Sequence, residues 1–169
     1  MVQSGEKACK MITFANNGSP SVRNREPRRR PTQYPAVCND GDKWFLSIAG
    51  YEVTVERHNI EDDSWGYLPS LNVIRNAAAA VVLHHVAYVF CGADARGDLN
   101  SIEKLALEGA GGRIDPESAW QLIRVDSAIL SPRYYPAVVA INDTEIAILA
   151  GYSSQDGYMG DVMLFNAQN

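Results

Sequence analysis

Residues 131–166 read SPRYYPAVVAINDTEIAILAGYSSQDGYMGDVMLFN, and this layout decides the fold because it occurs twice more upstream. Tyr135 to Ile141 is an apolar run of β-forming residues, Asn142-Asp143 is a turn pair, and Glu145 to Ala150 is a second run that ends at a glycine. This order predicts a β-hairpin. A third strand is predicted from Asp161 to Phe165, after a polar loop.

Two pairs of matching sequence segments show that the layout is repeated. Tyr34-Pro35-Ala36-Val37 matches Tyr135-Pro136-Ala137-Val138, and Ala49-Gly50-Tyr51 matches Ala150-Gly151-Tyr152, with proline and glycine fifteen residues apart in both copies. A middle copy runs from Arg75 to Gly92. Self-similarity at a period of roughly 40 to 60 residues indicates a repeat architecture.

The composition favours a folded chain without a nucleic-acid or membrane partner. Of 169 residues, 46% are hydrophobic, which is enough for a core, and the net charge of −5 disfavours binding to phosphates. No apolar run reaches the roughly 18 residues of a transmembrane helix. Cys9, Cys38 and Cys91 lack metal-ligand spacing, and no apolar signal segment begins the chain. A cytoplasmic setting is therefore expected.

Four sections are predicted. They are an N-terminal strand with an Arg/Pro-rich loop followed by three units, at 1–31, 32–74, 75–130 and 131–169. The first two units contain four strands each, and the second carries a Gly-rich loop insertion. The third unit stops before a fourth strand, so Met11 to Phe14 or the residues near Ser21 to Arg23 are expected to cover its open edge. The arginines between Gly18 and Thr32 indicate an exposed, irregular loop, or alternatively a nuclear-localisation or anion-binding patch.

These units resemble kelch repeats, each of which is a four-stranded blade of a β-propeller. The resemblance covers Thr32 to Asn166 and rests on an opening arginine, a small residue plus glycine after the second strand, an aromatic beside it, and a tryptophan at the fourth strand. The residues concerned are Arg75 and Arg133; Ala49-Gly50, Cys91-Gly92 and Ala150-Gly151; Tyr51 and Tyr152; Trp65 and Trp120. The chain departs from the family by having one glycine instead of two, and Thr32 in place of the first arginine.

The resemblance implies an all-β fold, a partial β-propeller of about three four-stranded antiparallel kelch-type blades. Kelch propellers close with about five to seven blades, so three leave the ring open. The chain is then a piece of a longer propeller, or forms a homodimer that completes a six-bladed ring, or remains open. The expected tryptophan position is between blades, where burial of a large ring is stabilising.

The implied function is non-enzymatic binding of a polypeptide partner through inter-strand loops. The alternatives are a propeller enzyme resembling galactose oxidase or sialidases, and a structural fragment without its own partner. In a four-stranded blade, the loop between strands two and three and the connection between blades share one face. The candidate partner-binding residues expected on that face are Tyr51, Arg75, Asp94, Arg96, Asp98, Arg133, Tyr152, Gln155, Asp156 and Tyr158.

No catalytic, cofactor or metal site is predicted. His84-His85 is interpreted as a hairpin turn, since adjacent strand residues face opposite ways, and His58 as a surface residue. Asp94 to Asn100 lacks the ligand spacing of a calcium loop and is interpreted as a turn. Gly109 to Gly112 lacks the glycine pattern and the following helix of a dinucleotide site. No serine, histidine or cysteine pattern establishes a catalytic group.

Overall fold

The computed structural model describes residues 9–14, 20–25, 33–41, 43–107, 114 and 117–168, the first two ranges by their backbone. Every regular element in these ranges is a β-strand, so the chain is all-β, as predicted. No helix that could cross a membrane occurs in them. The predicted insertion at Gly109 to Gly112 lies outside the described residues.

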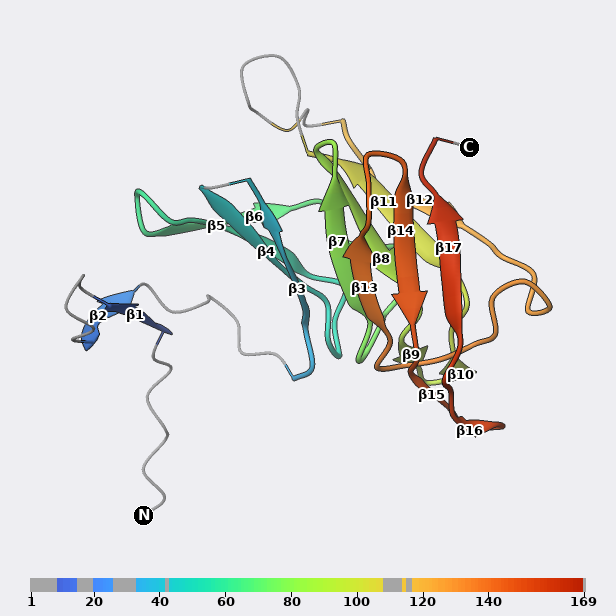
Figure 1. The fold of residues 1–169 in the computed structure, drawn as a ribbon. Coiled ribbons are helices and arrows are strands. Elements are labelled where there is room, and N and C mark those ends of the chain that lie inside the picture. Colours follow the sequence, from blue (N-terminus) through green and yellow to red (C-terminus); the bar gives the residue numbers. More distant parts are fainter. Residues whose placement is uncertain are drawn as a thin grey trace.

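Three antiparallel sheets follow one another like the blades of a partial propeller (Figure 1). The first blade contains β3 (Ala36–Asp40), β4 (Trp44–Ile48), β5 (Val55–Asn59) and β6 (Ser64–Leu68), in that spatial order. The second contains β7 (Ala79–Leu83), β8 (Val86–Phe90), β11 (Ile102–Ala106) and β12 (Gln121–Ile123). The third contains β13 (Ala137–Ala140), β14 (Glu145–Leu149) and β17 (Val162–Asn166), and thus three strands where the others have four.

The first strand of each blade lies innermost, because β7 contacts both β3 and β13. Backbone hydrogen bonds join neighbouring blades at matched places: Gly50 N–H donates to the carbonyl of Arg75, and Gly92 N–H donates to the carbonyl of Arg133. The blades therefore fan outward from a common inner edge, while their later strands diverge (Figure 1).

The three blades share an unusual backbone geometry. Positive φ angles recur before the first strand, at Tyr34, Ala77 and Tyr135 (52°, 53° and 54°). They also recur just before the glycine that follows the second strand, at Ala49, Cys91 and Ala150 (58°, 59° and 53°). Non-glycine residues seldom adopt this region, so its recurrence at matched positions marks one repeated design. A β-carbon added at Gly92 would lie 3.0 Å from the carbonyl oxygen of Asn76, which explains the glycine.

Apolar clusters fill the two spaces between blades. One contains Leu46 and Ile48 from the first blade with Val89 and Leu105 from the second, and Trp120 completes it. The Trp120 indole Nε1 donates to the carbonyl of Pro69 at 2.8 Å, so this ring lies between blades as the sequence predicts. The second cluster joins the second and third blades through residues that include Tyr88, Phe90, Ile146 and Ile148.

The N-terminal strands do not complete the third blade. β1 (Cys9–Phe14) pairs with β2 (Pro20–Arg25) in a separate two-stranded sheet, so the prediction that this segment covers the open edge is wrong. The physical reason is local: a short connection lets the two segments satisfy their backbone groups with each other. The irregular path predicted for Gly18 to Thr32 is also wrong for Pro20–Arg25, and the rest of that loop lies outside the described residues.

Two predictions about histidines have opposite outcomes. His58 is 2% exposed and lies 4.7 Å from the Trp65 ring and 4.8 Å from the Phe45 ring, so its assignment as a surface residue is wrong. His84 and His85 form the predicted turn between β7 and β8, with φ angles of 49° and 57°. They point to different blades, since His84 Nε2 contacts the carbonyl of Asp143 and His85 Nδ1 contacts Asp40.

Candidate binding surface

Two small hairpins extend from the second and third blades on the same face. β9 (Ala93–Asp94) pairs with β10 (Gly97–Asp98), and β15 (Tyr152–Ser153) pairs with β16 (Gly157–Tyr158). Each hairpin is anchored to the connection that enters its own blade, by bridges between Asn76 and Ala93 and between Tyr134 and Tyr152. Asp98 ties the two together, because it accepts hydrogen bonds from the Ser154 backbone N–H (2.5 Å) and hydroxyl (2.9 Å).

A connected row of tyrosines crosses this face from the first blade to the third. The ring centroids lie 5.9 Å apart for Tyr34–Tyr135, 5.1 Å for Tyr135–Tyr134, 5.3 Å for Tyr134–Tyr152 and 5.2 Å for Tyr152–Tyr158. Tyr34 and Tyr135 are each 53% exposed, and Tyr158 is 92% exposed. We call this row, together with the exposed Tyr51 beside it, the tyrosine surface.

Tyr135, in the middle of the tyrosine surface, has a raised pKa. Desolvation raises the pKa of Tyr135 from its ordinary value of 10.0, and the neighbouring hydroxyls of Tyr34 and Tyr134 add to the rise. Neutral phenols offer both a hydrogen-bond donor and an acceptor on a large apolar ring. A tyrosine also loses little conformational entropy on binding, which makes such a row suited to recognising a polypeptide.

The structure separates the ten predicted site residues into two groups. The first group is exposed or half-buried and lies on the two hairpins or near them. Its members are Tyr51, Asp94, Arg96, Asp98, Tyr152, Gln155, Asp156 and Tyr158. Arg75 and Arg133 are both completely buried, so neither can contact a partner as predicted. The reason is that each guanidinium folds back into its own blade.

Arg75 is held inside the second blade by a carboxylate and three further acceptors. Its Nε donates to Glu103 at 3.0 Å, Nη1 donates to the carbonyls of Cys91 and Ser101, and Nη2 donates to the Ser101 hydroxyl. Glu103 also accepts the backbone N–H of Asn72 and of Val73, which lie in the connection from the first blade. Burial lowers the pKa of Arg75, while the hydrogen bond to Glu103 opposes that change. Arg75 and Glu103 therefore fasten the connection from the first blade to the second blade.

Arg133 repeats this arrangement in the third blade. Its Nη1 donates to the Ala150 carbonyl, which matches the bond from Arg75 to the Cys91 carbonyl. Its Nη1 and Nη2 also donate to the two oxygens of Asp161, at 2.7 and 2.8 Å. Unlike Glu103, the Asp161 side chain is 41% exposed. The two arginines thus have the same structural role, but the carboxylate that pairs with Arg133 is more exposed to water than the one that pairs with Arg75.

Acid should weaken the Arg133–Asp161 pair. The hydrogen bond from Arg133 holds the pKa of Asp161 below its ordinary 3.8, so the carboxylate stabilises the fold above that value and this stabilisation is lost as the pH falls through the lower folded value. Asp161→Asn should therefore cost no more than about 1 kcal/mol at neutral pH, given the exposure of the pair. Urea unfolding between about pH 7 and pH 2 should show the difference from wild type shrinking with acidification. A constant difference would contradict this linkage.

The sequence does not predict a binding role for three members of the tyrosine surface: Tyr34, Tyr134 and Tyr135. Tyr34-Pro35 and Tyr135-Pro136 form a repeated pair in the sequence. An aromatic residue before an apolar run is, however, also typical of the first residue of a β-strand. Their positive φ angles place Tyr34 and Tyr135 outside the strands and leave their rings half exposed. The proline after each tyrosine, repeated at matched places, was the available signal.

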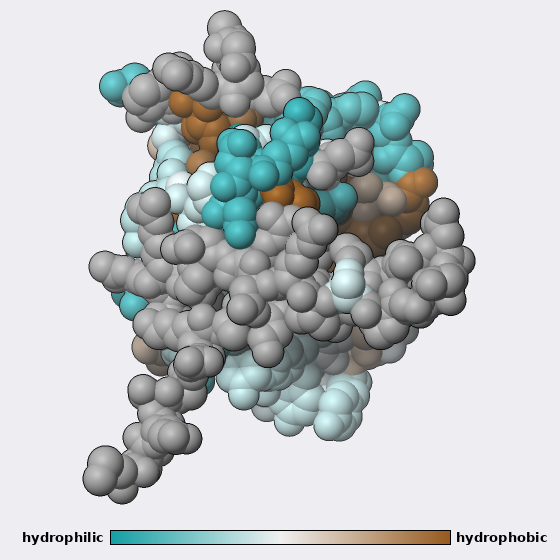
Figure 2. Space-filling view, turned by 90° about the vertical axis from the view of Figure 1, so that its left-hand side faces the viewer, coloured by the Kyte–Doolittle hydropathy of each residue, from teal (hydrophilic) through white to brown (hydrophobic). Residues whose placement is uncertain are grey.

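Other parts of the described surface mix polar and apolar residues. In the side view of Figure 2, hydrophilic areas of the described residues lie directly beside hydrophobic ones. Within the described ranges, no group of three or more His, Cys, Asp or Glu side chains is arranged to hold a metal ion.

A scan against models of protein families finds no match for this sequence, and a search of the curated proteins finds none either.

Proposed function

We propose that this chain is a non-enzymatic, kelch-type interaction module that binds a polypeptide partner through the tyrosine surface. The row of exposed and half-buried tyrosines, whose rings contact one another edge-on or at a tilt, carries the proposal. Tyrosine is enriched where proteins bind one another, because its ring supplies contact area and its hydroxyl supplies orientation. The row joins the segment that enters the first blade to the connection and hairpin of the third blade, so a partner would contact both blades.

The kelch assignment is supported by the repeated geometry. The matched positive φ angles, the glycines after the second strands and the arginine at the start of the second and third units fit that repeat. A homodimer that completes a six-bladed ring stays a prediction. The exposed apolar residues Val139, Val162 and Leu164 on the third blade are in keeping with it.

The experiment is a selection from a random-peptide display library on the immobilised chain, followed by titration of the enriched peptides. Affinity should fall at least about tenfold for Tyr135→Ser and for Tyr158→Ser, since central aromatic contacts carry most binding energy. Tyr67→Ser is the matched control, because Tyr67 is also about half exposed (51%) but lies on β6, outside the tyrosine surface. Its affinity should remain within about twofold of wild type.

Two results would count against the proposal. One is that no peptide is enriched above the level found with an unrelated protein on the same support. The other is that enriched peptides bind both tyrosine variants as tightly as they bind wild type.

A further inference from the structure

The third blade has an open outer edge among the described residues. In the first two blades the third strand pairs with a fourth, β5 with β6 and β11 with β12. The corresponding strand of the third blade, β17, pairs with β14 alone in the described part of the chain. An unpaired edge presents a row of backbone donors and acceptors that can accept another strand.

The groups on that edge can be identified from the register. Ala150 N–H donates to the carbonyl of Asp161, and Ala167 N–H donates to the carbonyl of Thr144. Because inward and outward bonding alternate along an antiparallel strand, Val162, Leu164 and Asn166 direct their N–H and C=O groups to the free edge. Two of these residues are apolar, and Leu164 is 61% exposed.

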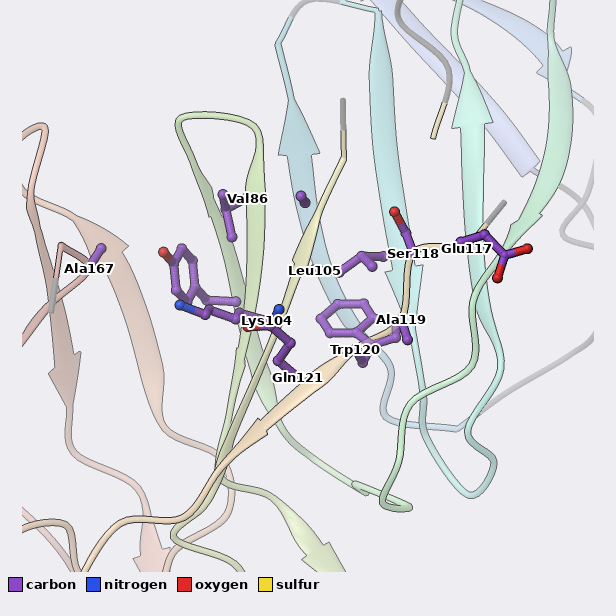
Figure 3. A pocket seen from close by; sticks show the side chains of 11 residues that line it. Val86, Lys104, Leu105, Glu117, Ser118, Ala119, Trp120, Gln121 and Ala167 are labelled. Atoms are coloured by element: carbon purple, nitrogen blue, oxygen red, sulfur yellow. The ribbon is translucent and has the colours of Figure 1, made fainter. Parts of the chain in front are cut away.

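A cleft of about 620 Å³ lies between the outer part of the second blade and the end of β17 (Figure 3). Its walls come from β8, β11 and the segment that leads into β12, and Ala167 borders it at the end of β17. Tyr88 lines the cleft and also contacts Phe165, with ring centroids 5.7 Å apart. The cleft is therefore continuous with the side of β17 that faces the second blade.

The repeat register indicates which side chain this cleft would take. In the first blade, Trp65 stands opposite His58; continuing the β11–β12 pairing by one residue sets Trp120 opposite Leu105. The matching position on β17 is Phe165, which packs toward the second blade. A fourth strand on β17 would thus direct its tryptophan into the cleft, as Trp120 is directed toward the first blade. In both existing fourth strands a branched aliphatic residue follows three positions later, Leu68 or Ile123.

No described strand of the chain is spare for this position. β6 and β12 are paired within their own blades, and β1 and β2 are paired with each other. A second copy could supply β6 or β12 only by opening a blade, and neither β1 nor β2 contains a tryptophan. We propose that the edge of β17 and the adjoining cleft bind a strand from a different polypeptide, added antiparallel to β17, with a tryptophan in the cleft and a leucine or isoleucine three residues later. This site goes beyond the proposed function, since the cleft lies where β11 and β17 end, whereas the β15–β16 hairpin of the tyrosine surface lies beyond the start of β17 (Figure 1).

The probe is a fluorescein-labelled peptide of residues 118–124, SAWQLIR, titrated with the full chain and followed by fluorescence anisotropy. We expect saturable binding with a dissociation constant of about 10–100 μM. A peptide with alanine in place of its tryptophan should bind at least about tenfold more weakly. Absence of saturation up to about 1 mM, or equal binding of the two peptides, would overturn the proposal.

Protein variants test the site. Leu164→Pro removes an outward N–H without touching the bonds to β14, and should weaken binding at least about tenfold, whereas Leu164→Thr keeps the N–H and should change it less than about threefold. Circular dichroism should show both variants folded; if Leu164→Pro is not, Ala167→Trp, which fills the cleft, should weaken binding in its place. Unchanged affinity for the folded blocking variant would overturn the assignment. Tyr158→Ser should leave this affinity unaltered, so the two binding sites can fail independently.

Discussion

Replacing Arg75 by alanine is expected to lower the free energy of unfolding by about 3–5 kcal/mol, because Glu103 would lose its ion-pair partner in a site with no exposure to water. The variant also leaves the carbonyls of Cys91 and Ser101 without the donor that now serves both. Urea unfolding at neutral pH measures the effect. A loss under about 1 kcal/mol would mean that the pair does not fasten the second blade.

Two comparisons isolate the buried charge. Arg96→Ala removes an exposed arginine and should change stability by no more than about 0.5 kcal/mol. The double change Arg75→Met with Glu103→Leu removes both charges and should recover a large part of the loss, since apolar replacements of a buried ion pair are often tolerated. Arg133→Ala should cost less than Arg75→Ala, because water can solvate the exposed part of Asp161.

Replacing Trp120 by alanine is expected to cost about 3–5 kcal/mol, since the indole is 4% exposed and fills the space between the first two blades. The change leaves a cavity beside Leu71 and Leu105, and it also removes the donor to the Pro69 carbonyl. Thermal or urea unfolding followed by circular dichroism measures the loss. Stability equal to wild type would show that Trp120 does not hold the blades together.

The control is Trp120→Phe, which retains most of the buried ring but loses the indole N–H. Its cost should be smaller, about 1–3 kcal/mol, because an unsatisfied carbonyl and a partial cavity remain. The order wild type, phenylalanine, alanine would separate packing from hydrogen bonding. An alanine variant as stable as the phenylalanine variant would contradict packing as the main contribution.

The strands and their pairing could be predicted because local features specify them. Alternating β-forming runs separated by turn pairs such as Asn142-Asp143 define hairpins without knowledge of distant contacts. The fifteen-residue spacing from proline to glycine then aligns the first and third blades. Trp120 could be placed between blades because a large ring on an outer strand has few other ways to leave water.

The site was predicted less well, because it depends on side-chain direction. Arg75 and Arg133 stand at connections, where arginine is usually exposed, and only the three-dimensional position of Glu103 or Asp161 reveals that each folds inward. Tyr34 and Tyr135 look like strand residues in the sequence, because a positive φ at a tyrosine leaves no mark there. The pairing of β1 with β2 is likewise not evident from the sequence. The alternative partner, the open edge of the third blade, exists only once the blades have assembled.

The most direct test of the central claim is isothermal titration of the best selected peptide into four proteins: wild type, Tyr158→Ser, Tyr67→Ser and Leu164→Pro. If the tyrosine surface binds the partner, only Tyr158→Ser should lose affinity, by at least about tenfold. Equal affinity for Tyr158→Ser and wild type would contradict the claim, and a loss confined to Leu164→Pro would assign the peptide to the edge of β17 instead.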